Sequence, residues 1–289
     1  MTTLRTVLQE AEFRKTAVGH FNISDLVTLK AIDETARELK VPVLVGVSEG
    51  ERAFMGVRQV AALVRSLRDD DASPVFLNAD HTHSLEKAEE AANAGFDEIL
   101  FDGSALTFEE NVDQTRRAVE AIKSINPSIL VEGEIGFIGS ASEILDEVPK
   151  SVHKLTTPAE AQQFIEATGI DVLSPAVGNM HGLLHSMVRG ESEKRLNIGT
   201  ISDIKGATGC FMTLHGASGT NGEDLKSAIQ AGITIVHFNT EIRLARRRGL
   251  EAALVKERDT VAPYKILPGA LEAVKQIVRF RLQMLNSAG

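Results

Sequence analysis

A regular alternation of short apolar runs with amphipathic segments constrains the fold most strongly, and it continues along the whole chain. The apolar, β-branched runs predict eight strands: Ala17–Phe21, Val43–Val47, Val75–Leu77, Glu98–Phe101, Ile129–Val131, Val172–Ser174, Phe211–Leu214 and Thr234–Phe238. The segments between them predict helices at Asp25–Leu39, Val57–Leu67, Leu85–Ala94, Phe108–Ile125, Pro158–Ala167, Ile198–Lys205 and Leu225–Gln230. Eight such units in 289 residues predict an α/β protein of one (β/α)8 barrel domain over residues 1–289. A doubly wound sheet is the minor alternative, because it usually has fewer strands.

Two longer segments and a tail lie outside these units. Gly136–Lys154 and Leu183–Asn197 read as insertions after the fifth and sixth strands, and long loops at this rim often act as lids. Gly269–Leu285 predicts a final amphipathic helix with basic residues, of a kind that packs or dimerises. We find no linker or low-complexity tract that would divide the chain.

Composition and charge exclude several classes of function. The net charge of -9 argues against nucleic acid as a partner, so an anionic substrate needs a local binding device. No apolar run approaches a membrane span, and the first residues lack the apolar segment of a signal peptide. The single cysteine, Cys210, lies in an apolar run and is predicted to be a buried structural thiol. These features predict a cytoplasmic protein without a membrane partner.

Histidines and carboxylates follow the predicted strands where the strands end. Asp80 and His81 follow the third strand, whereas His181 and His215 follow the sixth and seventh. The carboxyl ends of barrel strands converge on one axis. Three imidazoles with an open position form a common catalytic zinc site, so we predict a shared metal site, although a lone histidine would more often be an ordinary loop residue. Four other histidines do not follow this pattern: His20, His83, His153 and His185.

Four carboxylates have different predicted roles at the site. Asp102 and Glu134 end the fourth and fifth strands, where they would bind a second divalent ion or orient the histidines. Asp80 is placed to move a proton on a substrate hydroxyl near the metal. Glu143, in the loop after the fifth strand, is a candidate second acid/base delivered by loop closure, although a solvated loop charge fits equally well.

Small residues in two turns predict a phosphate site. Gly182 follows His181 directly, and Gly216 and Ser218 follow His215. Such turns expose backbone N–H groups near helix N-termini, which bind phosphate without a basic patch. A plain tight turn is the alternative for each. In a barrel, however, the loops after the last two strands commonly bind phosphate.

With these residues in place, the chain resembles the class II, metal-dependent ketose-bisphosphate aldolases, which include fructose- and tagatose-bisphosphate aldolases. The resemblance covers nearly the whole chain and rests on seven stretches: Gly19-His-Phe-Asn22, Asp80-His81, Phe101-Asp-Gly-Ser104, Val131-Glu-Gly-Glu-Ile-Gly136, Gly178-Asn-Met-His-Gly182, Leu214-His-Gly-Ala-Ser-Gly219 and Asn286-Ser-Ala-Gly289. It implies reversible cleavage of a phosphorylated ketose, such as fructose 1,6-bisphosphate, to dihydroxyacetone phosphate and an aldehyde such as glyceraldehyde 3-phosphate.

The resemblance also implies the roles of the metal and catalytic residues. Asp80 becomes the acid/base on the C4 hydroxyl, and Asp102 and Glu134 form an alternative metal position. The implied cofactor is one catalytic Zn²⁺, with a second divalent ion and a monovalent cation as further candidates. Cobalt, iron or manganese would suit the same imidazoles. The implied metal ligands are His81, His181 and His215.

The implied substrate contacts follow the family's motifs. One phosphate is bound by Gly182, Gly216 and Ser218, and the substrate also contacts Asn22 and Ser48. Three further candidates follow the eighth strand: His237, Asn239 and Thr240. The resemblance implies a homodimer or homotetramer.

The chain departs from the family pattern at four places. One is Asn78-Ala-Asp80-His81-Thr82, where the family usually has His-x-Asp-His with a small residue following. His237 stands where many members have asparagine, which leaves open whether it or Asn239 binds substrate. Ala262–Lys265 replaces the Asp-Pro-Arg of many members, which leaves open what binds a distal phosphate. The loop Gly139–Glu143 is offset by one residue from the family's glycine-glutamate loop.

Three other functions compete with this interpretation. A Schiff-base aldolase needs a lysine at a strand end, and the predicted strand ends carry none. A zinc-dependent barrel hydrolase would use the three histidines but gives no reason for the glycine turns. A non-catalytic barrel that binds sugar phosphate would not need Asp80 beside the ligands.

Overall fold

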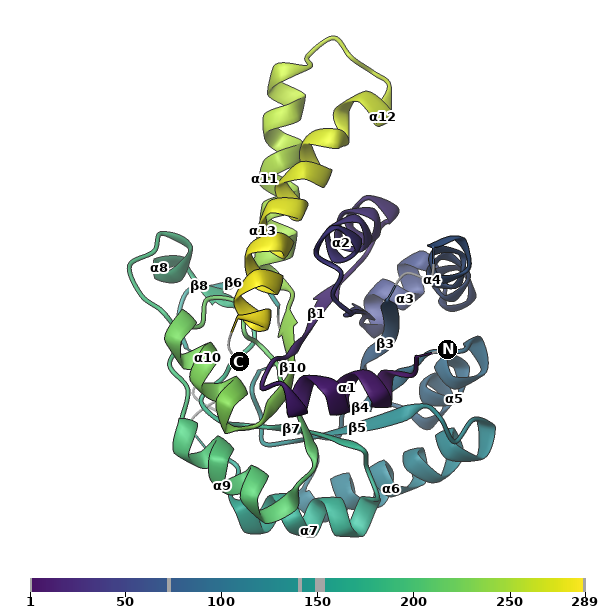
Figure 1. Cartoon of the computed structure of the whole chain (residues 1–289), viewed down its shortest axis with the longest axis vertical. Coiled ribbons are helices and arrows are strands. Elements are labelled where there is room, and N and C mark those ends of the chain that lie inside the picture. The colour runs from purple at the N-terminus through teal and green to yellow at the C-terminus, as the bar shows by residue number, and fades with distance from the viewer. Residues whose placement is uncertain (1, 72–73, 140–141, 149–153, 288–289) are drawn as a thin grey trace.

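The computed structural model describes residues 2–71, 74–139, 142–148 and 154–287. Its centre is a closed parallel barrel of eight strands in the order β1-β10-β9-β7-β5-β4-β3-β2, which confirms the predicted (β/α)8 fold (Figure 1). Each strand pairs with the next barrel strand along the chain, and β10 closes onto β1. The strands are β1 Val18–Asn22, β2 Val43–Val47, β3 Val75–Thr82, β4 Glu98–Phe101, β5 Leu130–Ile135, β7 Val172–Pro175, β9 Phe211–Leu214 and β10 Ile233–Phe238.

Helices surround this barrel and begin at side chains that cap them. Ser48, Thr107 and Thr157 each accept a hydrogen bond from the backbone N–H three residues later, where a glutamate completes a capping box. The longer helices are α1 Leu4–Phe13, α2 Leu26–Leu39, α3 Glu49–Met55, α4 Val57–Asp71, α5 Leu85–Ala94, α6 Phe108–Ile125, α7 Pro158–Thr168, α9 Ile198–Thr208, α10 Gly222–Ala231, α11 Thr240–Lys256 and α13 Pro268–Asn286. Two short helices are α8 His185–Val188 and α12 Pro263–Ile266. The helices α1, α3, α8, α11 and α12 were not predicted.

The helix α1 closes the amino-terminal end of the barrel. Its residues Leu4 and Leu8 are buried in a small apolar cluster that is separate from the core between strands and helices. The strand residues of this cluster are Val18, Leu44, Phe76, Leu130, Val172 and Ile235. Complete burial of a leucine contributes about 1.5–3 kcal/mol, so α1 seals the end opposite to the predicted site at a clear gain in stability.

Polar side chains form the next layer of the barrel interior. Because side chains alternate along a strand, the residue two positions after each inward apolar one also points inward. His20, Asn78 and Glu132 occupy such positions and are fully buried. The His20 ring lies against Gly46, where an added Cβ would lie 2.0 Å from the imidazole Cε1. The interior therefore changes from apolar to polar toward the carboxyl ends of the strands.

The helices α11 and α13 pair along their length and extend beyond the barrel (Figure 1). Their close approach depends on glycine, because an added Cβ at Gly249 would lie 2.6 Å from the carbonyl oxygen of Gly269. The helix α13 also packs against α2, where Lys275 forms ion pairs with Glu34 and Glu38. The predicted tail helix is thus present and packs on its own chain.

The two predicted insertions contact each other. A short strand in each, β6 Ile144–Leu145 and β8 Leu183–Leu184, forms a two-stranded parallel sheet. Residues 140–141 and 149–153 of the first insertion, with His153, lie outside the described residues, as do residues 288–289 of the closing motif. Backbone pairing thus joins the described parts of the two segments at the rim.

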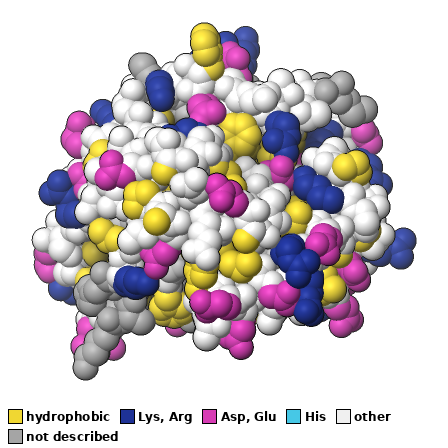
Figure 2. All heavy atoms as spheres, turned by 90° about the horizontal axis from the view of Figure 1, so that it is seen from below, with side chains coloured by type: hydrophobic (Ala, Val, Ile, Leu, Met, Phe, Trp, Pro, Cys, Tyr) yellow, Lys and Arg dark blue, Asp and Glu magenta, His cyan; other side chains and the backbone are white. Residues whose placement is uncertain are grey.

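The surface is of mixed charge where Figure 2 shows it. Among the described residues in that view, basic and acidic side chains are interspersed with single apolar ones. Within the described part of the chain, no helix combines the length and apolar character that crossing a membrane requires.

Candidate metal and phosphate site

Three histidines from separate barrel units meet at the carboxyl-terminal rim. His81 lies near the end of β3, His181 lies in the loop after β7, and His215 follows β9 directly. The ring centroid of His81 is 4.9 Å from that of His181 and 4.9 Å from that of His215. The three residues offer nitrogen atoms within 4.8 Å of one another. His81 also has a φ of 42°, an unusual backbone conformation for a side chain of this size.

Each of these histidines has one ring nitrogen next to an oxygen atom outside the cluster. His81 Nδ1 donates to Asp102 Oδ2 at 2.7 Å, His181 Nδ1 lies 3.5 Å from Ser142 Oγ, and His215 Nε2 lies 3.0 Å from Glu132 Oε1. Metal-bound histidines are usually oriented in this way. Within the described residues, His81 Nε2 and His181 Nε2 are buried without a hydrogen-bond partner. The donor set and these unpartnered nitrogens fit a divalent metal ion.

The electrostatics of the cluster also suit a cation. Burial lowers the pKa of His215 to about 3 and places the pKa of His181 well below its ordinary value, so both rings are neutral at pH 7. Burial also lowers the pKa of His81, but the carboxylates of Asp80, Asp102 and Glu134 outweigh this effect and raise it to about 10. A metal ion would displace that proton, because a ligating imidazole must be neutral.

Glu132 and Glu134 carry raised pKa values in this region. Burial and the charge of Asp80 raise the pKa of Glu132 to about 8, and its Oε1 lies 3.0 Å from His215 Nε2. Burial and Asp102 raise the pKa of Glu134 well above its usual range. Asp102 and Glu134 group with His81 as a second possible set of ligands.

Asp80 is a buried carboxylate held between polar neighbours. Its Oδ2 accepts a hydrogen bond from Asn22 Nδ2 at 2.8 Å, and its Oδ1 lies 3.7 Å from both His81 Nε2 and His237 Nδ1. Burial alone would raise the pKa of Asp80, but the nearby His81 and His20 hold it below the usual range. Asp80 is therefore ionised at neutral pH, as a general base must be.

A pocket connects this cluster with the predicted phosphate turns. Its glycines have the positive φ values that favour glycine, 78° at Gly182 and 64° at Gly216. An added Cβ at Gly216 would lie 2.2 Å from the carbonyl oxygen of Met180. The pocket is lined by Asn22, Asp80, Ser142, His181, Gly182, His215, Gly216, Ser218, His237, Asn239 and Thr240. Two of the predicted metal ligands, His181 and His215, thus share one pocket with the phosphate candidates and Asp80.

Five predicted site residues do not line this pocket: His81, Asp102, Glu134, Ser48 and Glu143. Ser48 is the N-cap of α3, where its hydroxyl accepts a hydrogen bond from the backbone N–H of Glu51. The side chain of Glu143 is exposed, while its backbone carbonyl accepts a hydrogen bond from the N–H of Leu183. The roles of Ser48 and Glu143 toward substrate stay predictions.

The family departures have different positions relative to the site. His237 and Asn239 both line the pocket, so both remain candidates for substrate contact. The segment Ala262–Lys265 lies at α12, at the outer end of the α11–α13 pair and away from the barrel (Figure 1). It therefore does not reach the site of its own chain.

His20 is the main residue of this region that the strand-end argument missed. Its ring stacks on that of His237, with 3.4 Å between centroids and 1° between planes. Its Nε2 lies 3.2 Å from Asn78 Oδ1. The alternation of side chains along a strand could have predicted it, because His20 is two residues before Asn22 and their side chains lie on the same face of the strand.

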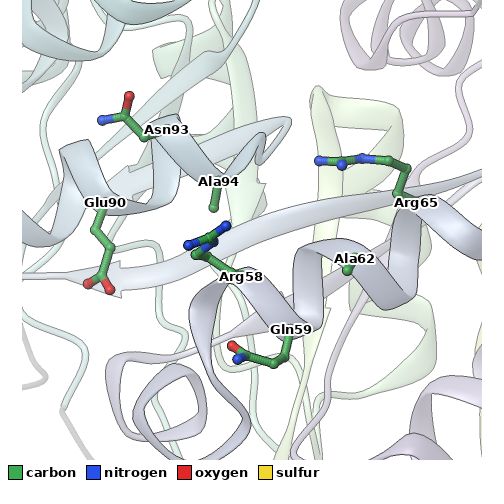
Figure 3. Close-up of a pocket in the computed structure, with 7 residues that line it drawn as sticks. All are labelled: Arg58, Gln59, Ala62, Arg65, Glu90, Asn93 and Ala94. Carbon is green, nitrogen blue, oxygen red and sulfur yellow. The ribbon is translucent and has the colours of Figure 1, made fainter.

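A separate groove lies outside the barrel, between α4 and α5 (Figure 3). Figure 3 shows Arg58 and Glu90 on opposite walls. The remaining lining residues are Gln59, Ala62, Arg65, Asn93 and Ala94. None of the predicted site residues lines this groove.

The fold and the site together define a class: a (β/α)8 barrel with a metal-competent histidine cluster at its carboxyl-terminal rim. The sequence model of the class-II fructose-bisphosphate aldolase family matches residues 2–289. The chain therefore belongs to this family of metal-dependent lyases, which confirms the resemblance.

Individual relatives match over almost their full length. The fructose-bisphosphate aldolase of Staphylococcus epidermidis is 33% identical over 291 residues, with 100% of this chain and 98% of that protein covered. The fructose-bisphosphate aldolase of Geobacillus stearothermophilus is 34% identical with the same coverage. The crystal structure of the YdjI aldolase from Escherichia coli K12 is similar at a TM-score of 0.83 and 27% identity, covering 100% of this chain and 98% of that one.

Proposed function

We propose that this protein catalyses the zinc-dependent, reversible aldol cleavage of a phosphorylated ketose, fructose 1,6-bisphosphate or a close relative. The products would be dihydroxyacetone phosphate and an aldehyde such as glyceraldehyde 3-phosphate. One observation carries the proposal. The unpartnered nitrogens of His81 and His181 lie beside the ionised Asp80, in a region continuous with the glycine turns.

The metal would be held by His81, His181 and His215. A zinc ion there supplies Lewis-acid stabilisation of the negative charge that develops when the carbon–carbon bond breaks. Asp102 and Glu132 would keep two of the imidazoles oriented.

Asp80 would act as the base in the cleavage direction. It takes the proton of the C4 hydroxyl while the C3–C4 bond breaks, and it returns that proton in the condensation direction. Asn22 orients the carboxylate through the 2.8 Å hydrogen bond to Oδ2. The backbone N–H groups of Gly182, Gly216 and Ser218 would bind one phosphate. Asp102 and Glu134 would form an alternative metal position.

Several finer properties belong to the same proposal. We propose one barrel domain over residues 1–289, a cytoplasmic location and a homodimer or homotetramer. The substrate would also contact Ser48, His237, Asn239 or Thr240, and Glu143 would act as a second acid/base.

The direct test follows dihydroxyacetone phosphate release from fructose 1,6-bisphosphate, with tagatose 1,6-bisphosphate in parallel. We expect turnover that chelation removes and zinc restores, and the ratio of the two rates names the preferred sugar. Metal-loaded protein that cleaves neither sugar would contradict the proposed substrate class.

An Asp80→Asn variant separates chemistry from metal binding. We expect it to retain zinc but to lose cleavage by a factor of about 10² or more, because the base is absent. Asp113→Asn, on the outer helix α6, is the matched control and should retain activity. Near wild-type turnover by the Asp80→Asn variant would refute the assigned role.

A further inference from the structure

A lysine that plays no part in the proposed reaction lies buried behind the site. Lys194 belongs to the second predicted insertion, and its side chain is only 4% exposed. Its Nζ donates hydrogen bonds to the carbonyl oxygens of Met180 at 2.7 Å, Gly182 at 2.6 Å and Gly216 at 2.9 Å. An ammonium group has three N–H donors, and all three are used. Among the described residues, no carboxylate lies within ion-pair distance of it.

These three carbonyls flank the predicted metal ligands. Met180 and Gly182 stand on either side of His181, and Gly216 follows His215. Gly182 and Gly216 also line the pocket as predicted phosphate residues. One buried ammonium thus links the two turns that carry two metal ligands and the phosphate-binding N–H groups.

The backbone around Lys194 holds it in this position. Its N–H donates to Gly219 O at 2.9 Å, and its carbonyl accepts from Asn221 N at 3.1 Å. The next residue, Arg195, forms a two-bond ion pair with Asp224 at 2.8 and 2.9 Å. Both sides of Lys194 are therefore fixed to the chain that follows β9.

Three converging buried carbonyl oxygens require hydrogen-bond donors or a cation, since buried acceptors without a partner are costly. A monovalent metal ion can be held by such a ring of backbone carbonyls. The sequence resemblance suggested a monovalent cation as a cofactor. In this chain the ammonium group stands at the point where the three oxygens converge.

We propose that Lys194 is a positioning residue that provides this cation from within the chain. It holds the turn of His181 against the turn after His215. The distance between the metal ligands and the phosphate-binding N–H groups is thereby fixed. Small monovalent cations are then unnecessary. The inference rests on the proposed aldolase function for its kinetic readout, but its stability readout is independent of that function.

The first test compares the wild-type protein in potassium chloride, ammonium chloride and tetramethylammonium chloride at equal ionic strength. We expect the melting temperature, kcat and KM to be the same in all three, because the site is already filled. Stimulation or stabilisation of the wild-type protein by potassium alone would overturn the proposal.

The second test removes the ammonium group in a Lys194→Ala variant. In tetramethylammonium chloride we expect a KM for fructose 1,6-bisphosphate raised about tenfold or more and a lower melting temperature. Ammonium or potassium ions should reverse part of both changes, because they fit the vacated space and tetramethylammonium does not. A folded variant that no small cation rescues would contradict the proposal.

The matched control is Lys205→Ala. Lys205 also donates to two backbone carbonyls, those of Gly209 and Cys210, but it lies at the end of α9 away from the pocket. Cation rescue should be absent there. If the protein cleaves no sugar phosphate, the melting temperatures of the wild type and of Lys194→Ala in the three salts still decide the inference.

Discussion

At the scale of single residues, Glu98 shows how the barrel interior changes the pKa of a side chain. Its side chain is fully buried, and one carboxylate oxygen accepts a hydrogen bond from Asn78 Nδ2 at 2.9 Å. Burial, reinforced by the nearby Glu132, raises the pKa of Glu98 well above 4.5. Glu98 therefore binds a proton in the folded protein at a pH where the unfolded chain has lost it.

This shift gives stability a dependence on pH. Because the folded state binds more protons, the contribution of Glu98 is complete below about pH 4.5 and is lost as pH rises through the folded pKa. We predict that Glu98→Gln flattens the decline of melting temperature with rising pH and stabilises the protein at pH 8. Thermal unfolding between pH 5 and 9 measures this, with the exposed Glu120→Gln as control. Parallel curves for Glu98→Gln and the wild type would show that Glu98 carries no such linkage.

Some site residues could be predicted from the sequence, and others could not. Asp80 lies near the end of β3, His181 lies in the loop after β7 and His215 follows β9 directly, and one local motif places each at the rim. His20 and Glu132 point into the barrel from within strands, so their contacts depend on neighbours far away in sequence. Lys194 was not predicted either, because its three partners are turns that only the closed barrel brings together.

At the scale of elements, the α11–α13 pair depends on a close approach of two helices. An added Cβ at Gly249 would lie 2.6 Å from Gly269 O and 2.7 Å from Ala273 Cβ. We predict that Gly249→Val lowers the free energy of unfolding by about 1–3 kcal/mol, as overpacking usually does. Denaturant unfolding measures the change.

A second glycine serves as the control for this substitution. Gly206, in α9, has no atom within 4 Å of an added Cβ. Gly206→Ala should stabilise the protein by about 0.5–1 kcal/mol through its higher helix propensity. Equal effects of Gly249→Val and Gly206→Ala would contradict the packing argument.

The predicted elements were correct where periodicity was strong. All eight barrel strands were found, but the third was predicted to end at Leu77, whereas β3 continues to Thr82. Its final residues are polar because they enter the site, so hydrophobic pattern could not extend the strand. The pairing of β6 with β8 was not predicted, because a strand of two residues is too short to show an alternating hydrophobic pattern.

At the scale of the whole molecule, the barrel creates a local site for an anionic substrate in a chain whose net charge is -9. Carboxylates and imidazoles from separate units surround one point at the rim, where a divalent cation would balance them. Glycine turns supply the N–H groups for an anion beside it. The closed topology, with α1 sealing the opposite end, leaves this rim as the place where the polar interior opens to a pocket.

The central claim is that the three histidines hold the catalytic metal, and zinc content tests it most directly. We would measure zinc per chain after dialysis, together with turnover, in the wild type, His181→Ala and His185→Ala. His185 is the control because its side chain is 57% exposed and lies apart from the cluster. We predict about one zinc per chain in the wild type and His185→Ala, and loss of both zinc and turnover in His181→Ala. Unchanged zinc content and turnover in His181→Ala would contradict the account.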